Sequence, residues 1–83
     1  MLIINDSARK HGLGDDDLIT LWESWIEQVW VEDDRPGRLL RVCIDDAGRP
    51  WEMVAIVFDD SRTMIIHAMR LRTVTAELVR KNR

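Results

Sequence analysis

The sequence predicts a single α+β domain over residues 1–83, with a two-layer arrangement of helices packed on an antiparallel sheet. Hydrophobic residues recur at helical spacing near both ends of the chain and alternate with period two between them. Short turn sequences separate four apolar segments between residues 27 and 69. Because short turns join antiparallel neighbours, these segments predict a meander of about four strands.

The N-terminal segment predicts a short strand followed by two helices. Leu2-Ile3-Ile4 is apolar, and Asn5-Asp6-Ser7 after it are residue types that cap helices. A first helix is expected from about Ser7 to His11, ended by Gly12 in the left-handed conformation. Asp15-Asp16-Asp17 then places negative charge on the first turn of a second helix, where the helix dipole favours it.

The second helix has an apolar face that includes two tryptophans. Five residues follow at i, i+1, i+4, i+7 and i+8, which places them on one side of a helix: Leu18, Ile19, Trp22, Trp25 and Ile26. Burying a large ring is strongly favourable. Both tryptophans are therefore expected in the core rather than on a surface that stacks nucleobases.

After the second helix the hydrophobic period changes from 3.6 to 2. A Pro36-Gly37 pair suits a type II turn after the first strand. The third strand is apolar except at Glu52, as is typical of a central strand covered on both faces. In the fourth strand, alternation places His67 on one face with Ile65 and Met69. The strands are expected around Val29–Val31, Leu39–Ile44, Trp51–Phe58 and Met64–Met69.

A C-terminal helix is expected from Thr73 onward. Leu71, Val74 and Leu78 have helical spacing, so this side is expected to pack on the sheet. The other side carries Arg80 and Lys81. The predicted order is therefore β-α-α-β-β-β-β-α.

Charge is divided unevenly along the chain. Residues 1–61 carry six basic and fourteen acidic side chains, a net charge of −8, whereas residues 62–83 carry six basic residues and one acidic residue, a net charge of +5. A basic C-terminal quarter can present a local positive surface to an anionic ligand. A solvated terminal helix explains the same pattern without a ligand.

Several function classes are excluded by simple patterns. The longest apolar runs are too short for a spanning helix or a signal peptide, so a cytoplasmic protein without membrane partners is expected. Cys43 is the single cysteine and cannot form an internal disulfide. The Asp pairs and the Asp triplet fall at turns or helix starts, where Asp is structural, so neither a metal nor another cofactor is expected.

The cationic and imidazole groups suit metal-independent chemistry on RNA. Cleavage of a phosphodiester needs a base for the 2′-hydroxyl, cations for the phosphorane oxygens and a proton for the leaving 5′-oxygen. His67, in an apolar strand, can equally be a satisfied core residue, and the other cations can equally form a solvated face. The groups of the right kind are Arg9, Lys10, His11, His67, Arg70 and Arg72.

The sequence resembles a known family, the small BrnT-like toxins of bacterial type II toxin–antitoxin systems. The resemblance rests on three short stretches and on the acidic start of the second helix. The stretches are Ser-Ala-Arg-Lys-His-Gly at residues 7–12, Ala47-Gly48-Arg49, and Ile-Ile-His-Ala-Met-Arg-Leu-Arg at residues 65–72. The resemblance spans nearly the whole chain. It implies a RelE-like ribonuclease fold and cleavage of RNA without metal. It also implies a cognate antitoxin, in a hetero-oligomer or beside a homodimer.

The resemblance also implies roles for particular residues. Lys10 or His11 would be the general acid or base, and Arg70 with Arg72 would clamp the phosphate. The expected substrate-binding residues are Arg9, His67, Arg80 and Lys81. This hypothesis requires the first helix and the last strand to meet around one phosphate-sized hollow. A non-catalytic interaction module that keeps the same fold is the alternative.

Overall fold

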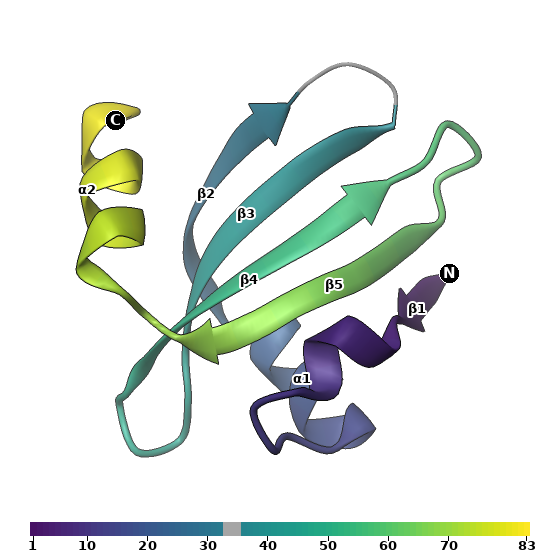
Figure 1. Ribbon diagram of the computed structural model, residues 1–83, viewed down its shortest axis with the longest axis horizontal. Coiled ribbons are helices and arrows are strands. Elements are labelled where there is room, and N and C mark those ends of the chain that lie inside the picture. Colours follow the sequence, from purple (N-terminus) through teal and green to yellow (C-terminus); the bar gives the residue numbers. More distant parts are fainter. Residues whose placement is uncertain (33–35) are drawn as a thin grey trace.

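The computed structural model describes residues 1–32 and 36–83, and it has an α+β fold, as predicted (Figure 1). The five strands form one sheet in the order β1-β5-β4-β3-β2. The strands β2 to β5 are antiparallel neighbours, whereas β1 pairs with β5 in parallel, so the sheet is mixed. The elements are β1 (Leu2–Ile4), η1 (Asp6–Arg9), α1 (Asp15–Glu23), β2 (Trp25–Glu32), β3 (Gly37–Ile44), β4 (Pro50–Val57), β5 (Thr63–Arg70) and α2 (Thr73–Lys81).

The first predicted helix is a single 3₁₀ turn, η1, and it ends earlier than expected. Its backbone follows the edge of β5, where the Asn5 amide donates to the Ile65 carbonyl and the Ser7 hydroxyl donates to the Ile66 carbonyl. These contacts hold the start of η1 at the sheet edge. Gly12 has a φ of 87°, the left-handed conformation that the sequence predicted.

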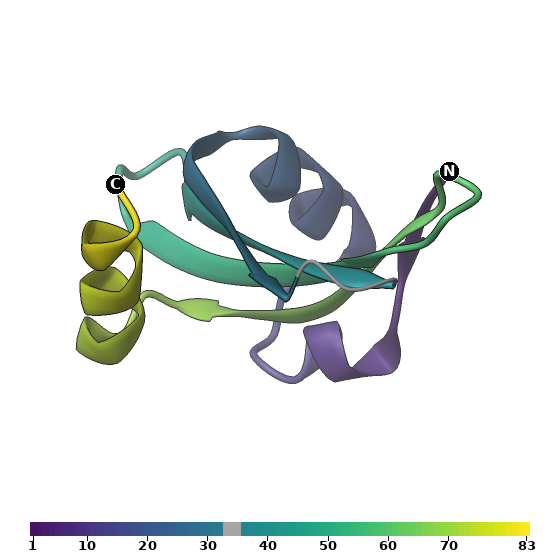
Figure 2. The ribbon, with the colours of Figure 1, turned by 90° about the horizontal axis from the view of Figure 1, so that it is seen from above.

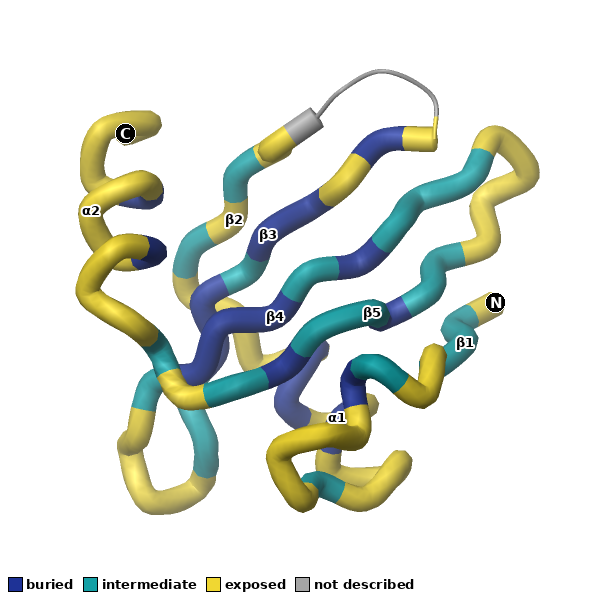
Figure 3. Tube along the Cα trace, in the orientation of Figure 1, coloured by how far each residue is buried: buried dark blue, intermediate teal, exposed yellow. Residues whose placement is uncertain are grey.

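The helices cover opposite faces of the sheet, so the predicted two-layer arrangement is wrong (Figure 2). Leu39 and Cys43 of β3 belong to the core cluster under α1, whereas the alternating residues Leu40 and Val42 belong to a smaller cluster with Val79 of α2. Strand β4 is central and is buried along much of its length, as predicted (Figure 3). The apolar sheet has two faces to cover, and one helix packs on each.

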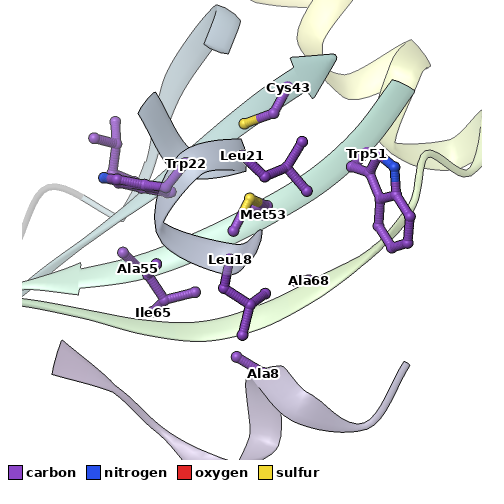
Figure 4. Packing of buried hydrophobic residues seen from close by; sticks show 11 residues of the cluster. Ala8, Leu18, Leu21, Trp22, Cys43, Trp51, Met53, Ala55, Ile65 and Ala68 are labelled. Atoms are coloured by element: carbon purple, nitrogen blue, oxygen red, sulfur yellow. The ribbon is translucent and has the colours of Figure 1, made fainter. Parts of the chain in front are cut away.

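The larger cluster lies between α1 and the sheet (Figure 4). Leu18, Leu21 and Trp22 of α1 are buried there with Met53 and Ile65 of the central strands. Ala8 of η1 is also buried in this cluster. The N-terminal half of the chain is therefore fixed to the sheet by α1 and by the packing of η1 at its edge.

Helix α1 is shorter than predicted, because the chain enters β2 immediately after Ser24. Trp25 pairs with Cys43 of β3 and is 40% exposed, whereas Trp22 is 4% exposed. Ile19 and Ile26 are also exposed, so the prediction of a five-residue buried face is correct only for Leu18 and Trp22. The segment after Ser24 is rich in aromatic and β-branched residues, and pairing with β3 overrides the helical spacing.

A β-bulge changes the faces of β5. Ala55 pairs with Ile65 and Met53 with Ala68, and both pairs lie in the cluster under α1. Regular alternation would separate Ile65 from Ala68, but the register shift opposite Val54 and Ala55 allows both to face α1. His67 pairs with Val54 on the opposite face, so the prediction that it shares a face with Ile65 is wrong.

Of the three residues predicted to pack the C-terminal helix on the sheet, Leu71 alone packs against the cluster with Val79, and it lies before α2. Thr75 and Val79 are buried, whereas Val74 is 67% exposed and Leu78 is 42% exposed. The Leu71 amide still bonds to the Pro50 carbonyl of β4, and the helix begins only at Thr73. Leu71 therefore extends the strand, and helical spacing counted from it gives the wrong face.

The described Asp clusters have structural roles, as predicted. Asp15-Asp16-Asp17 forms the first turn of α1, and Asp60 bonds to Arg62 in the turn after β4. Asp45 accepts hydrogen bonds from the Trp51 indole, from the Arg49 side chain and from two backbone amides of its turn. The turn predicted at Pro36-Gly37 begins in residues 33–35, which lie outside the described residues together with the Asp33-Asp34 pair.

The described helices are short compared with the thickness of a membrane. Both α-helices span nine residues, and neither is long and apolar enough to cross a bilayer.

Candidate active site

A buried carboxylate, Glu52, lies at the centre of a cluster with His67 and Arg72, called the Glu52 cluster below. Glu52 is 1% exposed. Its Oε2 atom lies 2.9 Å from His67 Nε2 and 2.7 Å from Arg72 Nη2. Its Oε1 atom accepts hydrogen bonds from the Arg72 backbone amide at 3.0 Å and from Arg72 Nε at 3.1 Å.

The strand register and the start of α2 bring these groups together. Glu52 and Val54 project from the same face of β4, and His67 is the cross-strand partner of Val54. Glu52 and His67 are therefore diagonal neighbours, within reach of each other's side chains. Arg72 directly precedes α2, so Glu52 also places negative charge at the N-terminus of that helix.

The electrostatics of the cluster keep Glu52 ionised. Burial by itself raises the pKa of this carboxyl, but hydrogen bonds from Arg72, Thr75 and His67 outweigh it and lower the pKa to about 2. A carboxylate with such a low pKa is a weak base. It is better suited to fixing the orientation and tautomer of the neighbouring imidazole, as the acidic residue does in a catalytic triad.

A ligand can reach the outer members of the cluster. The side chain of His67 is 32% exposed and that of Arg72 is 52% exposed, although Glu52 beneath them is buried. If His67 Nε2 donates its hydrogen to Glu52, the other ring nitrogen, Nδ1, is left as an acceptor. Within the described chain, Arg72 Nη1 makes no hydrogen bond to protein.

The two arginines predicted to clamp a phosphate lie on different faces of the sheet. Arg70 pairs with Trp51, which belongs to the cluster under α1, and its guanidinium lies 5.9 Å from the Trp51 ring centroid. Arg72 contacts Glu52 on the α2 face. Arg80 and Lys81 are exposed on α2, where Arg80 forms an ion pair with Glu77. Of these four cations, Arg72 alone contacts the Glu52 cluster.

The predicted N-terminal residues lie near the sheet edge but are not joined to the cluster. Hydrogen bonds hold η1 beside Ile65 and Ile66, next to His67. Arg9 is neutralised by ion pairs with Asp6 and Asp15. Lys10 and His11 are exposed. Among residues 1–32 and 36–83, no hydrogen bond or ion pair joins Arg9, Lys10 or His11 to the Glu52 cluster.

Two pockets in the described chain are lined by none of the predicted site residues. One, of about 300 Å³, lies between α1 and the turn after β3 and is lined by Leu21, Ser24, Asp45 and Trp51 among others. The second, of about 270 Å³, lies at the turn after β4 beside Phe58. Neither is the hollow that the sequence-based hypothesis requires between the first helix and the last strand.

Sequence reasoning missed Glu52, although the sequence contains a signal for it. An acidic residue within the otherwise apolar Trp51–Phe58 segment must find partners, because an unpaired buried charge is costly. That reasoning points to a nearby cation or histidine. It could not identify Arg72 and His67, because a register shift and the start of a helix determine which groups approach.

Metal clusters and reactive thiols are two further kinds of site to consider among the described residues. No three His, Cys, Asp or Glu side chains in that part of the chain lie close enough together to hold a metal ion. Cys43 is fully buried, and burial raises the pKa of its thiol to about 12. A thiol in that environment is not a nucleophile at neutral pH.

Comparison with known proteins does not assign the chain to a family. No protein-family model, curated protein sequence or solved structure matches it. The Glu52 cluster is therefore the main structural basis for a functional proposal.

Proposed function

We propose that this chain is the toxin of a type II toxin–antitoxin system, with a RelE-like fold, and that it cleaves RNA without a metal ion. In this proposal a cognate antitoxin neutralises it. The observation that carries the catalytic part is the Glu52 cluster, because it combines a fixed imidazole with a half-exposed guanidinium. These groups suit proton transfer and the binding of phosphate.

The reaction needs one proton removed and one supplied. Attack by the 2′-oxygen forms its bond to phosphorus as the bond to the 5′-oxygen breaks, which leaves a 2′,3′-cyclic phosphate and a 5′-hydroxyl. We assign His67 Nδ1 as the base that takes the 2′-hydroxyl proton, with Glu52 compensating the charge that forms on the ring. Arg72 would bind the phosphate, and Lys10 or His11 would protonate the 5′-oxygen.

The test compares variants of the two histidines. The His67→Ala variant should lose about 10²-fold or more of its RNA cleavage rate, since a positioned acid–base group contributes about 10² to 10⁴. A matched variant, His11→Ala, keeps the cluster intact and reports on the proton donor. Cleavage should continue in EDTA, and expression of the wild-type protein, but not of His67→Ala, should arrest growth.

Specific outcomes would contradict this assignment. If folded His67→Ala cleaves RNA at the wild-type rate, the cluster is structural and the base lies elsewhere. Equal loss in His11→Ala and Lys10→Ala, without any effect at His67, would place the chemistry at the N-terminal segment. Loss of cleavage in EDTA would contradict a metal-independent reaction.

A non-catalytic interaction module is the second candidate, and its support is the large apolar side chains left on the surface. Ile26, Trp30 and Val31, all on β2, are each about half exposed or more. Exposed apolar groups of this size are typical of binding surfaces when they gather in one place. Folded wild-type protein that neither cuts RNA nor arrests growth would favour this function.

A further inference from the structure

Strand β2 is the long strand at the outer edge of the sheet (Figure 1). One side of it pairs with β3, and within the described residues no strand pairs with the other side. Helix α1 packs on one face of the sheet and α2 on the other, where α2 also contacts β2 and Arg83 after it pairs with Glu27. An unpaired edge of this length presents backbone donors and acceptors that can bind another strand.

Exposed large apolar side chains are concentrated on this same strand. Of the eight exposed large hydrophobic residues in the described chain, four lie on β2: Trp25, Ile26, Trp30 and Val31. Sheet edges in monomeric proteins are commonly protected by charged residues or proline. From Trp25 to Val31, β2 has one charged residue, Glu27, and no proline. This composition favours association over protection.

The four apolar residues are placed symmetrically about Gln28. Trp25 and Val31 each lie three residues from it, and Ile26 and Trp30 each lie two residues from it. Antiparallel pairing of two copies centred on Gln28 brings Trp25 and Ile26 of one copy beside Trp30 and Val31 of the other. Pairs of an aromatic with a β-branched residue are favourable across strands.

We propose that β2 pairs antiparallel with β2 of a second copy of this chain, about a twofold axis at Gln28. The two sheets would then form one continuous sheet across the dimer. A twofold interface uses the same surface on both chains, and the symmetric arrangement of β2 meets that requirement.

The charges on the strand are compatible with this register. Glu27 would lie opposite Val29 of the second copy, so no two acidic residues of Trp25–Val31 face each other directly. Glu27 is also ion-paired with Arg83 at 2.7 Å, which neutralises it within its own chain. Register shifts occur near both ends of β2, at Ile26 and Val31, so Glu27 to Trp30 remain in regular pairing with β3.

The first experiment measures the oligomeric state by sedimentation equilibrium. The wild-type protein should be a dimer whose population depends on concentration. Trp30→Lys should raise the dimer dissociation constant at least about tenfold, because it puts a charge at the edge and removes an aromatic contact. The matched control, Val74→Lys, makes the same charge change at an exposed apolar residue of α2 and should leave the dimer intact.

The second experiment tests the register by cross-linking. Gln28→Cys should form a disulfide-linked dimer under mild oxidation, because the two positions meet on the axis. Cys43 will not interfere, since it is fully buried. Ala76→Cys, at an exposed position on α2, should remain largely uncross-linked.

Three outcomes would overturn the proposal. A monomeric wild-type protein would exclude the dimer, and a dimer that persists in folded Trp30→Lys would place the interface elsewhere. A dimer of the Gln28→Cys variant that does not cross-link would exclude the register centred on Gln28. None of these outcomes depends on RNA cleavage, which is tested at His67.

Discussion

Glu52 links strand β4 to strand β5 and to the start of α2. One carboxylate accepts hydrogen bonds from His67 on β5 and from both the backbone and the side chain of Arg72. It therefore anchors the start of α2 to the sheet and fixes the orientation of an imidazole that a ligand can reach. Because the anchoring depends on the ionised form, the stability of the fold should depend on the protonation state of Glu52.

Glu52→Gln removes the charge of this carboxylate. The substitution should cost about 2 to 3 kcal/mol of unfolding free energy near neutral pH, since it removes a buried, charge-assisted network. The pKa of Glu52 is lowered from 4.5 to about 2 on folding, so its contribution is complete above pH 4.5 and is lost as the pH falls towards 2. Urea unfolding across this range should therefore show a shallower pH dependence in Glu52→Gln than in the wild type.

The control for this prediction is Glu77→Gln. Glu77 pairs with Arg80 on the exposed side of α2, and such surface pairs contribute about 0 to 1 kcal/mol. Asp45, whose pKa is lowered to about 2, should contribute to the pH dependence that remains in Glu52→Gln, together with Asp15 and Asp60, whose pKa values are also lowered. Identical pH profiles for wild type and Glu52→Gln would show that the cluster does not stabilise the folded state.

At the scale of elements, α2 is attached to the sheet by few contacts. The Glu52 cluster holds its N-terminus, Val79 packs on Leu40 and Val42 near its C-terminus, and Arg83 pairs with Glu27 beyond its end. The cluster under α1 is larger. A helix docked through so few contacts is expected to open locally at a lower free energy than the rest of the fold.

The prediction for α2 compares two adjacent apolar residues. Val79→Ala should destabilise the protein by about 2 kcal/mol, because it removes buried methyl groups and leaves a cavity. Leu78→Ala should change stability by about 0.5 kcal/mol or less, since Leu78 is largely exposed. Urea unfolding gives both values, and amide exchange should show faster opening of α2 in Val79→Ala. Equal effects at both positions would contradict the packing of α2 described above.

At the scale of the whole molecule, charge is divided between an acidic body and a basic C-terminal segment. Residues 62–83 carry a net charge of +5 on a chain whose total is −3. Several of these cations are already paired within the fold, as Arg62 is with Asp60 and Arg83 with Glu27. The positive surface that RNA would meet is therefore smaller than the sequence count suggests.

The salt dependence of RNA binding reports how many cations contact phosphates. Replacing Arg80 and Lys81 together by alanine should lower the slope of log affinity against log salt by about 1.4, since each lost contact to a single-strand phosphate removes about 0.7. Arg62→Ala, at the turn after β4, should leave the slope unchanged. The measurement is RNA binding by fluorescence anisotropy at several salt concentrations, and an unchanged slope in the double variant would exclude these residues from the RNA surface.

Local patterns in the amino-acid sequence were enough to predict the class of the fold, the order of its strands along the chain, the central position of β4 and the acidic start of α1. These features follow from local patterns, because hydrophobic period, turn residues and helix-start charges act over a few neighbouring positions. The BrnT-like resemblance and the toxin function that it implies remain a proposal.

Which residues come into contact could be read only from the folded chain. Trp25 lies in a strand rather than a helix because it pairs with β3. His67 and Ile65 lie on opposite faces because of a β-bulge, and Val74 is exposed because α2 begins only at Thr73. Each outcome depends on contacts between segments far apart in the chain, and local hydrophobic periodicity does not report such contacts. The candidate active site arose in the same way, because Glu52 gains its partners through strand register and the position of a helix end.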